Sequence, residues 1–151
     1  MVGFEPQPNL AFRMRGLVEE RSWSNVTIEN AGISNRSGTM GLRIPKNRSG
    51  SCPSASFERP DDSNGADLIE VKVTTLDEYF GQRMDPIRFL KIDVEGHELA
   101  VLNGGTGLLE RFHPDILMEC ERRHHSNDTT QSEVFQLLLN LGYEGAFSWQ
   151  G

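Results

Sequence analysis

The sequence predicts an α/β fold in which helices cover both faces of a mostly parallel β-sheet. Segments with the period-two pattern of strands alternate along the chain with segments that have the 3.6-residue period of amphipathic helices. An apolar run, Phe89–Val94, ends in carboxylates and leads into a glycine turn and a helix. Ligands of open α/β sheets bind outside the carboxyl ends of the strands, so this run also marks a candidate site.

The front of the chain predicts a strand, a helix and a second strand. Val2–Glu5 is short, largely apolar and closed by prolines, and the helix Asn9–Arg21 follows with Asn9 as its N-cap. Val26–Ala31 then shows the alternation of a strand. The apolar residues of the helix recur at helical spacing and should form one buried face: Leu10, Met14, Leu17 and Val18.

The middle of the chain predicts a hairpin-like segment, a loop and another strand. Turn residues at 35–38 precede Met40, Leu42 and Ile44, which alternate with Gly41 and Arg43. Residues 45–67 are rich in Pro, Ser, Asn, Gly and Asp and predict a long exposed loop. Ile69–Thr74 is the next strand, and Thr75 can cap a short helix that begins at Leu76.

The second half continues the alternation of strands and helices. Gly104 and Gly142 follow helical segments and should end them. The predicted strands are Phe89–Val94, central in the sheet, then Asp115–Glu121 and Tyr143–Trp149. The predicted helices are His97–Asn103, Leu108–Phe112 and Ser132–Leu141.

Length and composition indicate one soluble globular domain, residues 1–151. Hydrophobic residues make up 36% and charged residues 25% of the chain, which is enough for a core. A net charge of −7 argues against nonspecific nucleic-acid binding and against an anionic membrane surface. No apolar run approaches the ~20 residues of a membrane span. Two cysteines in unlike contexts, Cys52 and Cys120, favour free thiols over a disulfide or a zinc site.

Two observations bear on the compartment, and they disagree. No signal peptide is visible, which favours the cytoplasm by default. Asn-x-Ser/Thr sequons have meaning only in the secretory pathway, which stays open as the alternative, although Asn and Ser also gather in turns. The sequons lie at Asn25, Asn35, Asn47 and Asn127.

The candidate catalytic residues follow the strand Phe89–Val94. Asp93 and Glu95 are two apart, so on a regular strand both would point to one face. A positioned carboxylate or imidazole can take the proton of a reacting hydroxyl, which makes Asp93, Glu95 and His97 candidate bases. His97 could instead be a solvent-exposed residue at the start of a helix. Lys91, within the apolar strand, should pair with a carboxylate or reach the surface.

Two further sets of side chains are weaker functional candidates. Glu119 ends the next predicted strand and could contact a substrate or partner from the same crevice. His124 and His125 are adjacent in a polar segment, which favours a solvated loop over a metal site.

Several blocks of this sequence resemble, in the same order, the FkbM family of S-adenosylmethionine-dependent methyltransferases. The most specific block is Leu90–Glu98, followed by Leu102 and the glycine pair at 104–105. Together the blocks span nearly the whole chain. The others are Gly3-Phe4-Glu5-Pro6, Asn25–Ser34, Val73–Asp77, Pro114–Glu119 and Leu141–Tyr143.

The resemblance implies a Rossmann-like methyltransferase fold and S-adenosyl-L-methionine as cofactor. It implies that Glu5 binds the cofactor ribose and that Asn30 and Ala31 lie beside the adenine. In such a site Asp93 could hold the methionine end of the cofactor, orient the substrate or take its proton. It also implies O-methylation of a hydroxyl on a small molecule or a glycan. The family's first strand and glycine-rich loop should precede Val2, so we expect a domain that is incomplete at its N-terminus.

Two other functions remain open at this stage. A truncated, catalytically inactive methyltransferase remnant could serve as an interaction module. Metal-dependent hydrolysis could use Asp93, Glu95, His97 and Glu98 as ligands, but the sequence lacks a second ligand group at metal-binding spacing, so we expect no metal. The sequence leaves the oligomeric state undetermined.

Overall fold

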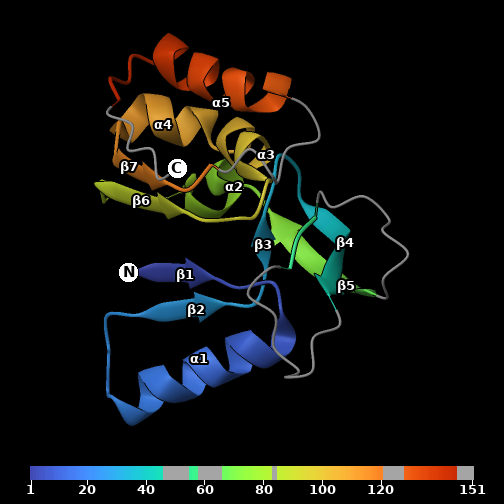
Figure 1. Ribbon diagram of the computed structural model, residues 1–151. Helices are drawn as coiled ribbons and strands as arrows, with labels where there is room; N and C mark the ends of the chain where they lie inside the picture. The colour runs from blue at the N-terminus through green and yellow to red at the C-terminus, as the bar shows by residue number, and fades with distance from the viewer. Residues whose placement is uncertain (46–54, 58–65, 83–84, 121–127, 146–151) are drawn as a thin grey trace.

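The structure is a computed structural model that describes residues 1–45, 55–57, 66–82, 85–120 and 128–145. Strands and helices alternate along most of this chain, which confirms the α/β prediction (Figure 1). The strands form three small sheets, and the candidate functional residues lie where their ends meet the following loops.

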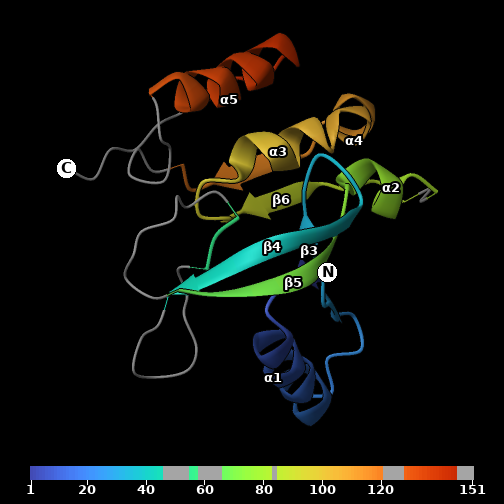
Figure 2. The same ribbon diagram turned by 90° about the vertical axis from the view of Figure 1, so that its right-hand side faces the viewer.

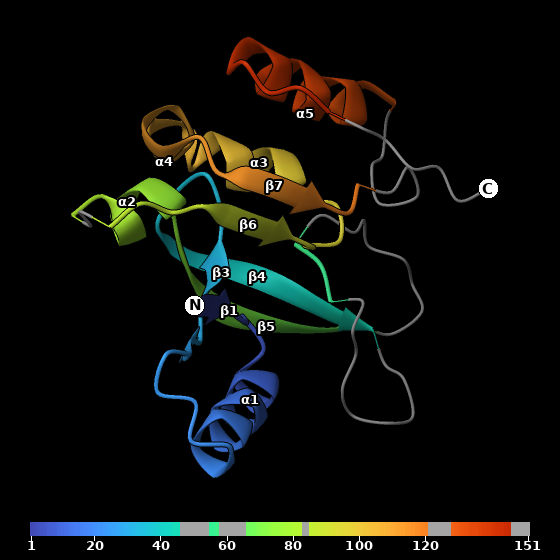
Figure 3. The ribbon, with the colours of Figure 1, turned by 90° about the vertical axis from the view of Figure 1, so that its left-hand side faces the viewer.

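Two of the sheets each consist of one pair of parallel strands. β1 (Val2–Phe4) pairs with β2 (Thr27–Glu29), and β6 (Phe89–Ile92) pairs with β7 (Asp115–Met118). Figures 1 and 3 show β1 and β6 as neighbours, but no ladder joins them in the described part of the chain. The parallel pairing is therefore as predicted, whereas a single continuous sheet is not seen.

The third sheet is mixed and contains the longest ladder. β3 (Gly32–Ile33) runs parallel to the end of β5 (Ala66–Thr74), and β4 (Gly38–Pro45) runs antiparallel along the whole of β5. An antiparallel partner needs no crossover helix, so β4 can return directly to β5. Most of the predicted loop 45–67 lies outside the described residues, namely 46–54 and 58–65. Ser56, within this loop, forms a β-bridge with Arg43 and so lies beside β4.

Helix α1 (Pro8–Glu20) begins earlier than predicted and is less buried. Gln7, not Asn9, is the N-cap, because proline suits the first helical turn and the Glu5 carboxylate accepts the Gln7 N–H at 2.8 Å. The predicted apolar face is not buried. Leu17 is 52% exposed, and Ala11 is the buried residue of this helix.

The other helices agree more closely with the prediction. α2 (Leu76–Phe80) begins at Thr75, whose Oγ1 accepts the Glu78 N–H at 2.9 Å. Gly142 follows the last helix with φ of 81°, as its predicted role requires. Residues 143–145 are irregular rather than a strand, and the rest of that prediction lies outside the described residues. The remaining helices are α3 (Glu98–Asn103), α4 (Thr106–Phe112) and α5 (Asp128–Asn140).

The hydrophobic core lies between the strands and α2–α5. Figure 2 shows α1 on one side of the strands and α3, α4 and α5 on the other. No helix in the described ranges has the length and apolar character needed to cross a membrane. The buried core residues are Ile33, Leu76, Phe80, Ile92, Val101, Leu102, Leu108, Leu109 and Val134.

Candidate functional site

Asn30 joins the carboxyl ends of β1 and β2. Its Nδ2 donates hydrogen bonds to the main-chain oxygens of Glu5 at 2.9 Å and Pro6 at 3.1 Å. Because the two strands are parallel and end together, Glu5 and Asn30 meet at one sheet edge, as the sequence predicts. The amide group of Asn30 thus fixes the turn between β1 and α1.

The Glu5 carboxylate stabilises the turn that leads into α1. One oxygen accepts the Gln7 N–H at 2.8 Å, immediately before the first residue of α1. Burial raises the pKa of Glu5 above its ordinary value, and the hydrogen bond from Gln7 lowers it in part. Glu5 is therefore a partly buried acid that stabilises the start of the helix.

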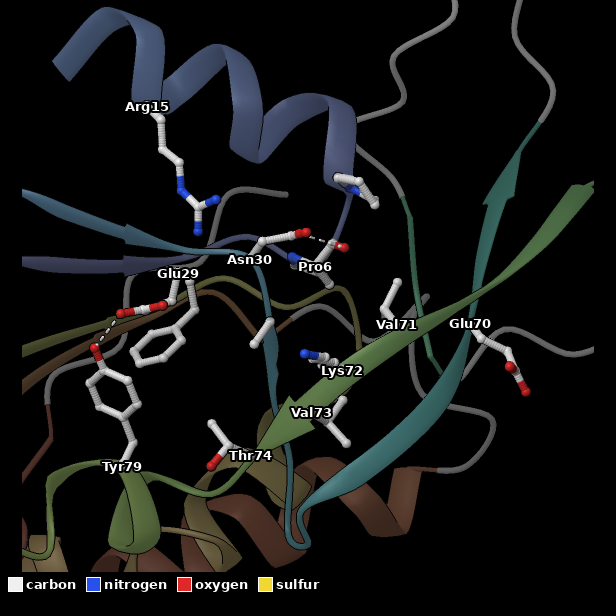
Figure 4. A pocket seen from close by; sticks show the side chains of 13 residues that line it. Pro6, Arg15, Glu29, Asn30, Glu70, Val71, Lys72, Val73, Thr74 and Tyr79 are labelled. Carbon is white, nitrogen blue, oxygen red and sulfur yellow. Dashed lines mark hydrogen bonds between the residues drawn. The ribbon is translucent and has the colours of Figure 1, made fainter. Parts of the chain in front are cut away.

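A pocket of about 600 Å³ opens beside this turn (Figure 4). Of the predicted site residues, Asn30 and Ala31 line it, whereas Glu5 lies between two lining residues, Phe4 and Pro6. The volume falls within the range of small-molecule sites. The other lining residues are Pro8, Arg15, Glu29, Glu70, Val71, Lys72, Val73, Thr74 and Tyr79.

One side of the pocket carries a hydrogen-bonded carboxylate. The Tyr79 hydroxyl donates to Glu29 Oε1 at 2.7 Å, and the Tyr79 ring meets Phe4 edge-on with centroids 4.8 Å apart. Neither residue is among the candidates that the sequence indicates. Glu29 could have been noticed because it directly precedes Asn30 at a strand end, but Tyr79 lies 50 residues away and gives no local signal.

The opposite side of the pocket belongs to β5, and α1 closes it from a third direction. Figure 4 shows Lys72 on β5, and Arg15 directed from α1 towards the strands. The Arg15 guanidinium is anchored, because its Nε donates to the main-chain oxygen of Ile28 at 2.8 Å. The pocket therefore combines apolar surface with both signs of charge.

The predicted acidic cluster after β6 is arranged differently from expectation. β6 ends at Ile92, and Glu95 and Gly96 have φ of 53° and 101°, so the chain is not extended there. Asp93 and Glu95 therefore do not share a strand face, and that prediction was wrong. Ser56 Oγ donates to the main-chain oxygen of Glu95 at 2.7 Å and so supports this turn.

Lys91 and Asp93 form an ion pair at the surface. Lys91 Nζ lies 2.8 Å from Asp93 Oδ2, and the two side chains are 60% and 42% exposed. The hydrogen bond and charge of Asp93 raise the pKa of Lys91. Lys91 thus both pairs with a carboxylate and reaches the surface, the two outcomes the sequence allowed. The prediction that Phe89–Val94 is a buried central strand was wrong at its first residue, since Phe89 is largely exposed.

His97 is buried rather than exposed at a helix start. Only 3% of its surface is accessible, its Nε2 lies 3.0 Å from Ser34 Oγ, and its ring packs on Phe57 with centroids 4.9 Å apart. Asp93, by contrast, is exposed and paired with Lys91.

The segment 30–34 links the pocket to the acidic turn. Asn30 and Ala31 line the pocket, and Ser34, at the other end of β3, contacts His97. Between them, a Cβ on Gly32 would lie 2.8 Å from the Phe57 ring, so glycine permits the close packing of this ring. The two predicted halves of the site are thus connected through five consecutive residues.

The remaining candidates add no ligand cluster. Within the described ranges, no group of three or more His, Cys, Asp or Glu side chains is placed to hold a metal ion. Glu119 is exposed after β7. Cys120, the next residue, is half-buried. His124, His125 and Cys52 lie outside the described residues.

Comparison with known proteins gives one family and one solved structure. The family profile described as the methyltransferase FkbM domain matches residues 1–144. The crystal structure of methyltransferase FkbM from Methylobacillus flagellatus KT superposes with a TM-score of 0.57 at 18% identity. The match covers 91% of this chain but 29% of that protein, so this chain corresponds to a minor part of its length. No curated protein matches the chain.

Proposed function

Because this chain belongs to the FkbM methyltransferase family, we propose that it is an S-adenosylmethionine-dependent methyltransferase domain. The proposed reaction is O-methylation of a hydroxyl on a small molecule or glycan. The cofactor supplies the methyl group, and the residues of this chain bind it, orient the acceptor and remove the acceptor's proton.

The pocket at the carboxyl ends of β1 and β2 is the observation that carries this proposal. Its position is the one that open α/β sheets use for ligands, and its volume of about 600 Å³ suits a nucleoside with a short side chain. Phe4 and Val73 offer apolar contact to a flat base, while Asn30 and Glu29 offer polar groups. The residues present therefore fit the cofactor that the family implies.

The proposed cofactor contacts follow the turn that Asn30 fixes. Asn30 and Ala31 border the adenine, and Glu5 uses the oxygen not bonded to Gln7 for the ribose. Asp93 contacts the methionine end. Holding the two reactants in line accounts for a large share of the rate in such transfers.

The proposed proton acceptors lie in the turn after β6. Asp93 or Glu95 takes the proton of the acceptor hydroxyl, a role worth roughly 100- to 10,000-fold in rate. His97 is too buried in this structure to touch a substrate. We propose instead that His97 positions the turn through Ser34.

The sheet edges suggest how the Rossmann-like arrangement is completed. β1 and β6 lie near each other in Figure 1 without a ladder between them, and each has a ladder on one side within the described residues. We propose that the family's glycine-rich strand lies between them and joins the two pairs into one parallel sheet. An unpaired strand edge is a ready template for such addition.

Calorimetric titration with S-adenosylmethionine and S-adenosylhomocysteine tests the cofactor assignment. We expect binding of both ligands, by this chain or by a version preceded by a glycine-rich strand, and no binding of homocysteine alone. Absence of binding in both versions would contradict the proposal. Transfer of a labelled methyl group to hydroxylated acceptors, followed by mass spectrometry of the product, then tests the chemistry.

A second candidate function is an inactive remnant that acts as an interaction module. Large apolar side chains on and after α1 favour it, since Phe12 is 78% and Trp23 is 52% exposed. This alternative predicts no binding of either nucleoside in the titration.

A further inference from the structure

We infer that Glu29 is a ligand-binding residue whose carboxylate accepts a hydrogen bond from a ribose hydroxyl of the nucleoside in the pocket. Tyr79 is its positioning residue. This inference rests on the proposed function and assigns a binding role to a residue that the resemblance leaves without one.

Glu29 lies where a ligand in the pocket can reach it. It is the last residue of β2, at the carboxyl end where the pocket opens, and it lines the pocket directly. Its side chain is partly buried, so a hydrogen bond to it is less screened by water than one at the surface.

The orientation of the carboxylate also favours this role. Tyr79 donates to Oε1 at 2.7 Å and holds the group in one rotamer (Figure 4). Tyr79 is itself held by two rings, because the centroids of Phe4 and Phe80 each lie 4.8 Å from its own. A recognition group that is already oriented loses less entropy when the ligand arrives.

The remaining hydrogen-bonding capacity of Glu29 sets the chemistry of the ligand. An ionised carboxylate only accepts hydrogen bonds and has about four lone-pair sites, of which Tyr79 uses one. The ligand must therefore bring donors. A ribose brings two adjacent hydroxyl groups, whereas a phosphate or carboxylate would be repelled by the charge.

Two other carboxylates lie near the pocket. Glu5 accepts the Gln7 N–H with one oxygen and offers the other to the ribose, as proposed above, so Glu29 adds a second carboxylate for the two adjacent hydroxyl groups. Glu70 lines the pocket but is exposed, and Figure 4 shows it on the far part of β5, directed away from Glu29. Glu19, exposed on α1 and outside the pocket lining, is the control with the same chemistry.

Calorimetric titration with S-adenosylhomocysteine of the unaltered chain and three variants tests the assignment, using the version that binds in the first titration. Glu29→Gln should weaken binding roughly tenfold, because it removes the charge that a hydroxyl donor prefers. Tyr79→Phe should weaken it less, since the carboxylate remains. Glu19→Gln should leave the affinity within about twofold. Thermal unfolding confirms that each variant is folded.

The analogues of S-adenosylhomocysteine that lack the 2′- or the 3′-hydroxyl identify the group that Glu29 contacts. For at least one of them, Glu29→Gln should no longer weaken binding, because the donor is absent. Equal affinity of the unaltered chain and Glu29→Gln for S-adenosylhomocysteine would overturn the inference and leave the proposed function intact. An equal loss with both analogues would overturn the ribose assignment. No binding by any version of the chain would overturn the function and the inference together.

Discussion

Ser34 and His97, 63 residues apart in the sequence, meet in a buried hydrogen bond, with Oγ and Nε2 3.0 Å apart. Ser34 is inaccessible to solvent and follows β3, whereas His97 is the N-cap of α3. This contact ties the turn that carries Asp93 and Glu95 to the segment that lines the pocket. Buried polar groups are costly unless paired, so this contact offsets part of the cost of burying both side chains.

Replacing Ser34 by alanine should lower the free energy of unfolding by about 1–3 kcal/mol, because a buried hydrogen bond between Ser34 and His97 is lost. Urea denaturation measures the change. Ser37→Ala is the control: this hydroxyl bonds Glu78 and Thr74 at an exposed position, so its loss should cost less than about 0.5 kcal/mol. Equal costs for the two variants would show that the Ser34–His97 contact contributes little.

Asn30→Ala should destabilise the chain and weaken nucleoside binding. The variant removes the hydrogen bonds from the Asn30 amide to the main-chain oxygens of Glu5 and Pro6, which should lower the free energy of unfolding by about 1–2 kcal/mol. Denaturation and titration with S-adenosylhomocysteine measure the two effects. Asn140→Ala removes an exposed contact with Gln136 and should change neither by much. Unchanged ligand affinity in Asn30→Ala would speak against its place in the cofactor site.

Gly104→Ala should be among the most destabilising small substitutions in the chain. A Cβ at Gly104 would lie 2.0 Å from the main-chain oxygen of Ser34, which neither segment can accommodate without moving. We expect a loss of at least about 2 kcal/mol, as for other overpacked sites. Gly16→Ala, in the middle of α1 with open space around it, should instead stabilise by up to about 1 kcal/mol. Thermal melts of the two variants should therefore shift in opposite directions.

Glu95→Gly should raise stability even though Glu95 is a proposed catalytic residue. Glu95 has φ of 53° after a strand, a left-handed conformation that costs a residue with a side chain about 1–2 kcal/mol. Glycine loses more conformational entropy on folding, which offsets part of this gain. The free energy of unfolding should still rise by about 0.5–1 kcal/mol.

Ser22→Gly is the matched control for this substitution, because Ser22 has the same φ in an exposed turn after α1. Both variants should be more stable in denaturation experiments, but only Glu95→Gly should lose methyl transfer. Retention of full transfer by Glu95→Gly would remove Glu95 from the mechanism.

Glu5→Gln should make stability less dependent on pH. Burial raises the folded-state pKa of Glu5 above its ordinary value of 4.5, so the folded state holds the proton more tightly than the unfolded chain. The corresponding stability is present below pH 4.5 and is lost as the pH rises through the folded-state pKa.

A glutamine can still accept the Gln7 N–H without carrying a charge. Relative to the unaltered chain, the variant should therefore gain stability at neutral pH and lose this advantage in acid. Urea unfolding between pH 4 and 8 measures the difference, with the exposed Glu19→Gln as control. A constant difference across this range would contradict the burial of an ionised Glu5.

The comparison of prediction and structure separates local from long-range effects. The helix start at Thr75 and the helix stops at Gly104 and Gly142 were correct because caps depend on residues a few positions apart. The start of α1 was wrong because two local signals competed, and Pro8 with the Glu5 carboxylate prevailed over Asn9.

The site was predicted only in part for a related reason. Asn30 and Ala31 could be placed at a strand end from the sequence, and they line the pocket. Tyr79 could not, since its role depends on a contact with Glu29 that spans 50 residues. The burial of His97 also depends on Ser34, from a distant segment.

The sequence by itself determined the family, the order of most strands and helices, and the strand ends at which the functional residues lie. These features follow from short-range periodicity, capping and ordered motifs. Only the tertiary structure decided which strands pair, that the acidic turn is left-handed rather than extended, and that Glu29 and Tyr79 form one side of the pocket. Such contacts join segments far apart in the chain, and their free energy depends on packing that no local pattern records.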